Sequence, residues 1–429
     1  MKPAITIFIM LFAFHSVNAQ DYPIDLNITS KNFKEVREVC DIDNGKLWGR
    51  NLWAPMLLID VKTRFIVANQ PDKEGLLKKE GDVFIGYFPK NKAIANSTTD
   101  YGGENWMMVL YPLPADDYLM KYLCVHELYH RLQNQLNLVF SYSNDHMDQL
   151  DARILIKLEW VALEKSMNEV NAEKRNESLT DALVFRNYRR ELYPGSDTME
   201  NKMELHEGLA DYTGHRIVSK TDEEYKTNAL TAKKMYWENN SYVRSFGYYS
   251  GLLYGYILDQ GNSDWKNDLK KSSDLGLMAK DINKINIPEN LKKAYEKSRN
   301  KYDFEDISQF ETAREKKLRE MLIAYRIKFT KDTVLVLDVP RPNVVFNPGS
   351  LVPLDNLGTV YPTIKIIGDW GTLQVNDGGC LFDWKKAIVP ATGIKKLENK
   401  ILGAGWELEL NQDWHLIRDG GNYQLKKSK

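Results

Sequence analysis

The sequence predicts an α+β fold in which an antiparallel β-sheet is followed by a mainly helical domain and then by a small all-β domain. Three observations support this prediction. Short β-rich runs alternate with turn residues between residues 53 and 113, helical hydrophobic spacing dominates residues 115–331, and β-rich runs return beyond residue 332. We therefore expect a signal peptide at 1–19, an N-terminal β-rich subdomain at 20–114, a helical domain at 115–331 and a C-terminal β domain at 332–429.

The first 19 residues have the features of a secretory signal peptide. Lys2 precedes an apolar run at 5–14, and Val17-Asn18-Ala19 supplies small residues for cleavage before Gln20. The apolar run is too short to cross a bilayer, and no cysteine lies at the cleavage point to carry a lipid. We expect a secreted or periplasmic protein without an integral membrane segment after the signal is removed.

Charge and cysteine content exclude two classes of protein. With 58 basic and 59 acidic residues the net charge is -1, so no general field attracts nucleic acid, and we expect no nucleic-acid partner. The three cysteines, Cys40, Cys124 and Cys380, are too few and too far apart for a disulfide framework. Cys124 lies close to the histidine motif described below, but a helix turns it about 200° from His126, so we expect a small buried side chain.

The individual elements follow from local patterns. Strands are predicted at 56–60, 64–68, 83–88 and 106–111, joined by hairpins. Pro112 and Pro114 end this sheet, and Asp116-Asp117 favours the start of a helix. Further helices are predicted from 150 to 167, at 178–192, 200–219, 222–238 and 308–326. In the C-terminal domain we expect strands at 334–337, 363–367, 373–375, 406–410 and 415–417.

The predicted helix after Asp117 contains the pentapeptide His126-Glu127-Leu128-Tyr129-His130, an H-E-x-x-H motif. Two histidines four residues apart on a helix are separated by about 40° of rotation, so both imidazoles can bind one metal ion. Glu127 falls at the edge of the same face, where it can act on a metal-bound water. The motif predicts a catalytic zinc site with one ion.

A catalytic zinc normally takes three protein ligands, so one more is needed. The leading candidate is Glu207, in His206-Glu207-Gly208-Leu209-Ala210-Asp211, where Asp211 is spaced to orient a zinc-bound imidazole. Glu159 is the alternative, because it lies on an intervening helix closer to His130 in the sequence.

On these two motifs the chain resembles the gluzincins, the superfamily that includes thermolysin and the zinc aminopeptidases. Their third ligand is a Glu in a Glu-x-x-x-Asp pattern on a later helix, which Glu207 and Asp211 reproduce here. The resemblance implies a zinc metallopeptidase in which Glu127 is the general base, Glu207 a ligand and Asp211 the partner of a ligand. The interval between His130 and Glu207 is longer than in thermolysin-like enzymes, which keeps Glu159 as a rival.

Weaker resemblances concern residues around these motifs. Tyr248 lies three residues before Gly251, as does the oxyanion-stabilising tyrosine of zinc aminopeptidases, although an aromatic core would also explain it. The segment 101–106 is similar to the strand that holds a substrate amine in those enzymes, but a glycine turn leading into a strand explains it without function. His146 and His215 could bind an oxyanion, and the structural alternative is favoured for both.

We therefore expect an exported zinc-dependent hydrolase of peptide bonds, with a peptide or protein as substrate. Two rival hypotheses are a metal-dependent hydrolase of a non-peptide substrate and a non-catalytic binding protein on the same scaffold. The C-terminal domain could bind a partner or pack on the catalytic domain. Its tryptophans could form a binding face, but core packing is favoured; they are Trp370, Trp384, Trp406 and Trp414.

Overall fold

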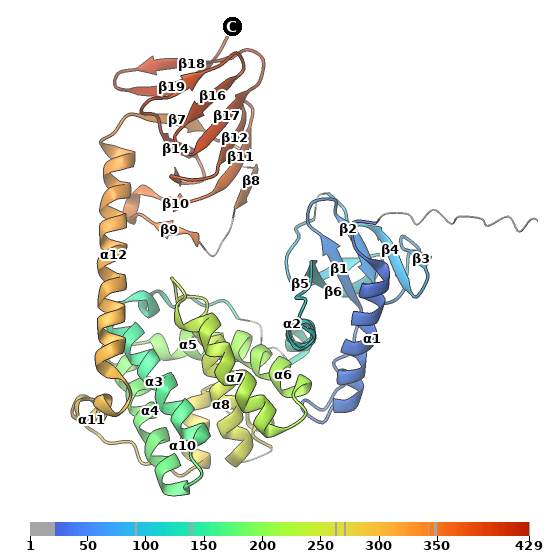
Figure 1. The fold of residues 1–429 in the computed structure, drawn as a ribbon, viewed down its shortest axis with the longest axis vertical. Coiled ribbons are helices and arrows are strands. Elements are labelled where there is room, and N and C mark those ends of the chain that lie inside the picture. The colour runs from blue at the N-terminus through green and yellow to red at the C-terminus, as the bar shows by residue number, and fades with distance from the viewer. Residues whose placement is uncertain are drawn as a thin grey trace, which may run out of the picture. The chain divides into compact units, whose positions relative to one another are not determined.

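The computed structural model describes residues 22–428, apart from residues 91, 137, 139, 262–263, 270–271, 342 and 347–349. These residues form a mixture of helices and strands with several sheets, compatible with the predicted α+β class (Figure 1). The predicted signal peptide and its cleavage site lie outside the described residues. The chain forms two compact units, each made of several segments: Met1–Ser141, Lys202–Thr231 and Ser263–Ser273 in the first, and Tyr142–Asn201, Ala232–Asn262 and Asp274–Lys429 in the second. The predicted domain boundaries stay predictions.

The first unit contains a six-stranded sheet in the order β3-β4-β2-β1-β6-β5. Its strands are β1 (Met56–Asp60), β2 (Phe65–Ala68), β3 (Lys78–Glu80), β4 (Val83–Tyr87), β5 (Ser97–Tyr101) and β6 (Glu104–Tyr111). The four predicted strands are present, whereas the short strands β3 and β5 were not predicted. Gly102 and Gly103 have positive φ angles and close the β5–β6 hairpin, so this segment is the predicted glycine turn.

The prediction that this sheet is purely antiparallel is wrong, because β1 pairs with β6 in parallel. The other pairs are antiparallel. Both parallel strands contain a continuous apolar run, at 56–59 in β1 and 106–111 in β6, and the run in β1 is fully buried. Such runs are typical of strands covered on both faces, and the intervening strands provide the long connection that a parallel pair requires.

The helices α1 (Leu26–Asp43) and α2 (Asp117–Leu136) of the first unit pack against each other. The helix α2 begins where predicted, and the Asp116 side chain accepts a hydrogen bond from the Leu119 backbone N–H at 2.8 Å. The helix α1 was not predicted. It buries Phe33, Val36 and Cys40, whose spacing is that of one helical face.

The predicted helix at 200–219 is three elements. The helix α5 (Ser196–Met203) leads into the π-helical segment η2 (Glu204–Gly208), which continues as α6 (Leu209–Val218). Most of α5 belongs to the second unit, whereas η2 and α6 belong to the first, which also contains most of α7 (Asp222–Trp237) and the short helix α9 (Trp265–Asp268). A π-helical turn within a helix frequently marks a functional site.

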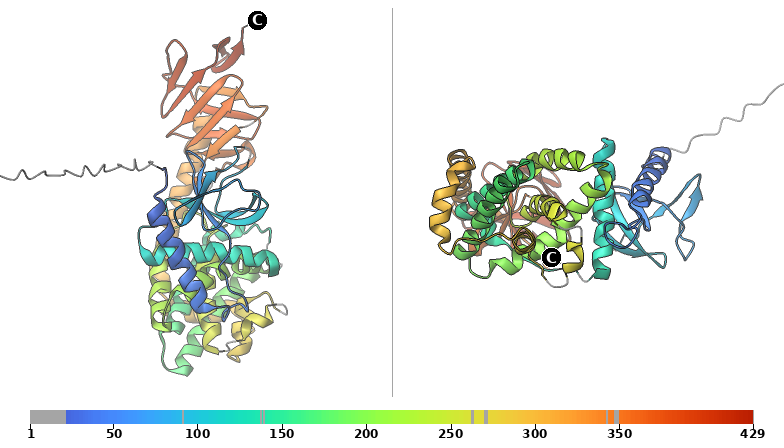
Figure 2. Two further views of the ribbon diagram at one scale, coloured as in Figure 1. Left: turned by 90° about the vertical axis from the view of Figure 1, so that its right-hand side faces the viewer. Right: turned by 90° about the horizontal axis from the view of Figure 1, so that it is seen from below.

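The helices of the second unit pack mainly around α3 and α4, which lie side by side (Figure 2). They are α3 (Leu150–Asn168), α4 (Ala172–Leu192), α8 (Phe246–Gly261), α10 (Leu275–Ile282), α11 (Leu291–Ser298) and α12 (Phe304–Thr330). The long final helix predicted at 308–326 is therefore confirmed as α12, extended at both ends. Among the described residues, none of the helices combines the length and the apolar character needed to cross a lipid bilayer.

The C-terminal strands of the second unit form a seven-stranded sheet, β18-β19-β7-β14-β13-β10-β9, and a six-stranded sheet, β15-β16-β17-β12-β11-β8. Their bounds are β7 Val334–Asp338, β8 Asn343–Phe346, β9 Val352–Pro353, β10 Thr359–Tyr361, β11 Ile364–Gly368, β12 Gly371–Val375, β13 Cys380–Phe382, β14 Lys386–Pro390, β15 Lys395–Lys396, β16 Lys400–Gly403, β17 Trp406–Leu410, β18 Trp414–Asp419 and β19 Asn422–Lys427. Residues of both sheets form one hydrophobic core.

The tryptophans of this β region have mostly structural roles. Trp370 and Trp406 lie in the core, and Trp414 packs against it. Their indole N–H groups are also used: Trp370 donates to the Asp338 carbonyl and Trp406 to that of Pro390, both at 2.8 Å. Trp384, with 51% of its surface exposed, is the exception. Core packing therefore explains three of the four tryptophans.

Candidate metal centre

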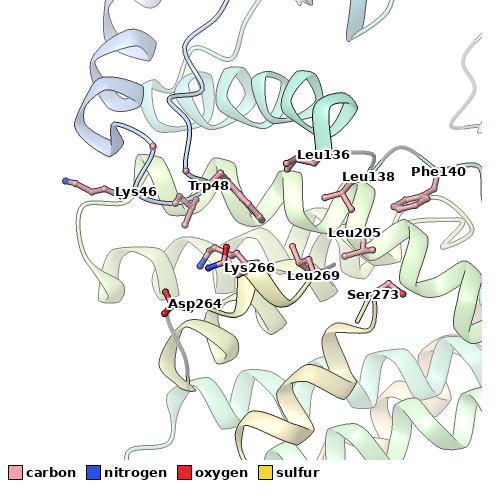
Figure 3. A pocket seen from close by; sticks show the side chains of 14 residues that line it. Lys46, Trp48, Leu136, Leu138, Phe140, Leu205, Asp264, Lys266, Leu269 and Ser273 are labelled. Atoms are coloured by element: carbon pink, nitrogen blue, oxygen red, sulfur yellow. The ribbon is translucent and has the colours of Figure 1, made fainter. Parts of the chain in front are cut away.

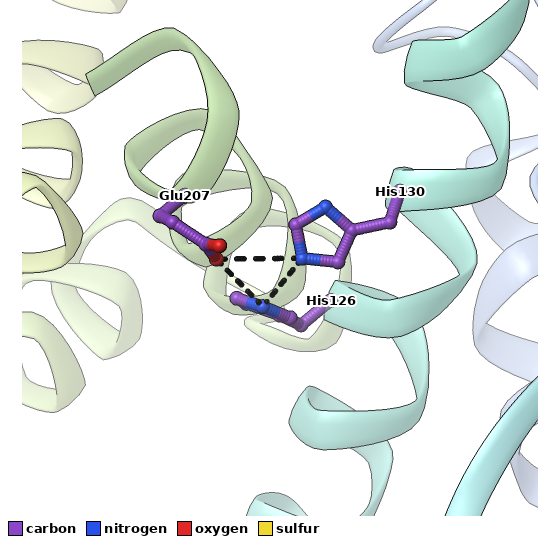
Figure 4. Close-up of side chains that lie close together, drawn as sticks. All are labelled: His126, His130 and Glu207. Atoms are coloured by element: carbon purple, nitrogen blue, oxygen red, sulfur yellow. Dashed lines mark hydrogen bonds and ion pairs between the residues drawn. The ribbon is translucent and has the colours of Figure 1, made fainter. Parts of the chain in front are cut away.

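Three side chains of the first unit converge on one point: His126 and His130 from α2 and Glu207 from η2 (Figure 4). The two histidine Nε2 atoms are 3.1 Å apart. Glu207 Oε2 lies 3.7 Å from Nε2 of His126 and 3.4 Å from Nε2 of His130. Among the described residues, these three form the one group of at least three His, Cys, Asp or Glu side chains that could hold a metal ion.

The separations fit a tetrahedral zinc ion. Zinc binds imidazole nitrogen and carboxylate oxygen at about 2.0–2.2 Å, which places neighbouring ligand atoms roughly 3.3 Å apart. The three observed separations lie on either side of this value. A set of two imidazoles and one carboxylate is also the ligand chemistry of a catalytic zinc that keeps its fourth position open.

Glu127, the predicted general base, is not one of these three candidate ligands. Its side chain is buried, and burial raises its pKa, although the charges of His126 and His130 oppose this shift. The Asn96 side chain, next to strand β5, lies close enough to Glu127 to lower its pKa slightly against the effect of burial. A buried carboxylate with a raised pKa is suited to accept and return a proton near neutral pH.

Asp211 on α6 lies behind His126, as predicted for the partner of a ligand. Its Oδ1 is 2.9 Å from His126 Nδ1, and it also accepts a hydrogen bond from the Tyr122 hydroxyl. Burial lowers the pKa of His126, but Asp211, Glu127 and Glu207 outweigh burial and raise it to about 9. The carboxylate therefore directs the other ring nitrogen of His126, Nε2, toward the point of convergence.

The surroundings of Glu207 keep its carboxylate ionised. Burial would raise its pKa, but the neighbouring imidazoles of His130, His206 and His126 hold the pKa well below its usual range. His206 Nδ1 lies 3.3 Å from the second carboxylate oxygen, Oε1. A regular helix would turn His206 about 100° from Glu207, but the local structure here is π-helical.

Close contact between α2 and α6 brings these side chains together, and Gly214 permits it. A Cβ atom at Gly214 would lie 2.8 Å from the Tyr122 ring and 2.9 Å from the Tyr122 carbonyl oxygen. Only glycine therefore fits at this crossing without a shift of backbone. Gly214 and Tyr122 carry no motif of their own, but each lies one helical turn from a predicted residue, Asp211 and His126 respectively.

His215 has a structural role in the first unit. Its Nδ1 lies 2.7 Å from the Tyr118 hydroxyl, and its ring packs on Tyr122 at 4.4 Å between centroids. Burial lowers the pKa of His215 to about 4, so its imidazole is neutral. The structural alternative favoured from the sequence agrees with these contacts.

The remaining candidates belong to the second unit. Both Glu159 carboxylate oxygens accept hydrogen bonds from arginines, at 3.2 Å from Arg186 and 2.6 Å from Arg189. His146 Nε2 lies 2.9 Å from Glu200 Oε1. Tyr248 is on α8, where its ring stacks on that of Tyr236; its role as an oxyanion donor stays a prediction.

A pocket of about 820 Å³ also lies in the first unit (Figure 3). Leu136, at the end of α2, and Leu205, in η2, form part of its wall, so the two elements that carry the convergent side chains also border this pocket. Trp48 and Phe140 add apolar surface, and Lys266 adds a charge. The three convergent residues are not among those that line it.

Comparison of the chain with protein-family models, curated proteins and solved structures finds no match. The functional argument therefore depends on the geometry of the site.

Proposed function

We propose that this chain is an exported zinc metallopeptidase of the gluzincin type, with zinc held by His126, His130 and Glu207. The observation that carries this proposal is the convergence of three ligand atoms within 3.7 Å of one another beside the buried Glu127. Bound zinc would polarise a substrate carbonyl and lower the pKa of water to about 7.

In the proposed mechanism Glu127 carries the proton. Its carboxylate accepts a proton from the attacking water and returns it to the leaving amine. Asn96 lies near this carboxylate, and burial raises the pKa of Glu127 above its ordinary value. Asp211 holds His126 in place throughout.

A peptide is favoured over a non-peptide substrate by the position of β5. This strand is the last in the sheet order, and within the described sheet it pairs only with β6. An extended peptide can add to such an edge through main-chain hydrogen bonds. Because Asn96 immediately precedes β5 and lies near Glu127, a peptide on this edge would run close to the general base.

Glu127→Gln is the direct test of this proposal. We expect the purified protein to hold about one zinc ion per chain and to cleave members of a fluorogenic peptide library. Glu127→Gln should retain zinc and lose about 10²- to 10⁴-fold in turnover, because the general base is removed while the ligands remain. Glu38→Gln, on the exposed face of α1, is the matched control.

Three outcomes would contradict the proposal in different ways. If the parent protein holds no zinc after incubation with the metal, the proposed zinc site is wrong and the hypothesis of a non-catalytic binding protein is favoured. Zinc without peptide cleavage would favour a non-peptide hydrolase. Undiminished turnover in Glu127→Gln would refute the assigned base.

A further inference from the structure

Gln133 is a buried polar residue that the predicted mechanism does not use. It lies on α2 one turn after His130, and its surface is fully buried. Its side-chain amide makes three hydrogen bonds. Oε1 lies 2.7 Å from His130 Nδ1, and Nε2 donates to the backbone carbonyls of Leu205 at 2.9 Å and His206 at 2.7 Å.

The two backbone carbonyls determine which way this amide points. A carbonyl oxygen only accepts hydrogen bonds, and the amide nitrogen of a glutamine has two hydrogens to donate. The reverse orientation would place Oε1 of Gln133 against two other oxygens in a buried place, with no hydrogen between them. Oε1 must therefore face His130.

The orientation of Gln133 in turn selects the tautomer of His130. Because Oε1 cannot donate, the shared hydrogen belongs to His130 Nδ1. The lone pair of this imidazole is then on Nε2, the atom that lies 3.4 Å from Glu207 Oε2 and 3.1 Å from His126 Nε2. A chain of hydrogen bonds that starts at backbone carbonyls thus presents the correct nitrogen for metal binding.

The same amide connects the two elements that carry the ligands. Leu205 and His206 immediately precede Glu207 in the π-helical segment, in which the Leu209 N–H bonds to the Glu204 carbonyl. Gln133 bonds to both carbonyls and to His130. One side chain therefore fixes the rotation of the His130 ring and the position of the segment from which Glu207 extends.

We propose that Gln133 is a positioning residue that holds His130 in its Nδ1–H tautomer and ties this ligand to the Glu207 segment. The consequence for zinc affinity rests on the proposed metal centre, whereas the tautomer is a property of the metal-free protein. Partners that orient a metal-binding histidine typically contribute about 10- to 100-fold to metal affinity.

The first measurement is ¹⁵N NMR of metal-free protein labelled at histidine, with His130→Gln used to assign the signal. We expect the hydrogen of His130 on Nδ1 in the parent and a mixture of tautomers in Gln133→Met. A parent hydrogen on Nε2 would overturn the proposal, and this result does not depend on how the variant folds or on whether zinc binds.

The second measurement is zinc affinity by competition with a chelating dye. Gln133→Met should bind zinc about 10- to 100-fold more weakly than the parent. The control is Gln135→Met, the same change at an exposed position of α2 whose amide accepts from Arg50. Gln133→Glu keeps an acceptor for His130 but no donors for the two carbonyls, so it should retain the tautomer and lose affinity.

Zinc affinity equal to the parent in Gln133→Met would refute the proposal and leave the metal centre intact. A parent that binds no zinc would instead refute the proposed function, and the tautomer result would still decide the role of Gln133.

Discussion

Each unit of the molecule buries a cluster of charged side chains, and the two clusters differ in how their charges are matched. In the second unit three arginines face three carboxylates. Arg189 pairs with Glu159 and Glu200, and Arg190 with Glu200 and Asp274, at 2.5–2.9 Å. Tyr254 completes the set by donating to Glu159 at 2.7 Å. Every carboxylate has a permanent cation beside it.

In the cluster of the first unit, histidines take the place of the arginines as the partners of Glu207 and Asp211 in the ion pairs described. The members of this cluster are two imidazoles and the carboxylates of Glu127, Glu207 and Asp211, and three of their lone pairs converge on one point. A buried group of this kind favours a positive charge at the point of convergence, as a proton or as a metal ion.

This difference separates Glu207 from its rival. Glu159 and Glu207 are both buried or nearly buried glutamates on helical elements, and each was compatible with a ligand role in the sequence. Their neighbours distinguish them. Guanidinium groups, which are always charged, donate hydrogen bonds to Glu159, whereas the neighbours of Glu207 are imidazoles, which can be neutral. The lesson is that a buried acid without a permanent counter-charge is the better candidate for a site.

We expect the largest effects on stability and on zinc content when one glutamate of each cluster is replaced by glutamine. Glu159→Gln leaves Arg186 and Arg189 facing a neutral amide, so we expect a loss of about 3–5 kcal/mol in the free energy of unfolding, with zinc content unchanged. Glu207→Gln should lose zinc, and its metal-free form should lose less stability than Glu159→Gln. Urea unfolding and metal analysis of both variants test this, and the opposite assignment of zinc loss would make Glu159 the ligand.

A second buried network of the second unit predicts a dependence of stability on pH. Lys157 Nζ lies 2.6 Å from Glu311 Oε1, and both side chains are fully buried. Burial lowers the pKa of Lys157 from 10.5 to about 8, although Glu311 opposes this shift. Between these two values the unfolded chain binds a proton that the folded chain has released, so the free energy of unfolding rises with pH across this window.

Lys157→Met should remove this rise. We expect the parent to gain about 2–3 kcal/mol relative to the variant between pH 8 and pH 10.5, because each pKa unit corresponds to about 1.4 kcal/mol. Urea unfolding of both proteins at several pH values gives the difference. If the free energies of unfolding of the parent and the variant change in the same way with pH, burial does not lower the pKa of Lys157 as stated.

In the first unit, Asp211→Asn should weaken zinc binding by about 10- to 100-fold, because an amide replaces the charged acceptor behind His126. Asp222→Asn, in the same unit with 53% of its side chain exposed, is the control. Zinc titration of the two variants separates orientation of the ligand from a general effect of charge. Equal affinities would mean that His126 needs no partner.

The smallest expected effect is that of Tyr122→Phe. The lost hydroxyl donates to Asp211, so removal should weaken zinc binding about 2- to 10-fold, the range of a typical single hydrogen bond. Tyr118→Phe, which loses its contact with His215 instead, should leave zinc affinity unchanged. A larger effect in Tyr118→Phe would place His215 in the metal centre.

Prediction from sequence succeeded where a pattern is local. The periodicity of the helices, the start of α2 at the acidic pair Asp116-Asp117 and the glycine turn before β6 all depend on residues a few positions apart. Prediction failed for the parallel pairing of β1 with β6, because that pairing joins strands separated by more than 40 residues of intervening chain. It also missed α1, although its buried residues have helical spacing.

The sequence by itself determined that His126 and His130 lie on one face of a helix with Glu127 at its edge, because the helical period fixes neighbours three and four residues apart. Only the tertiary structure decided that Glu207, and not Glu159, lies beside these histidines. Glu159 and its arginines, the two sides of the α2–α6 contact at Gly214, and the Gln133 amide and the carbonyls to which it donates are far apart in the sequence. Long-range packing brings such groups together, and no local pattern records it.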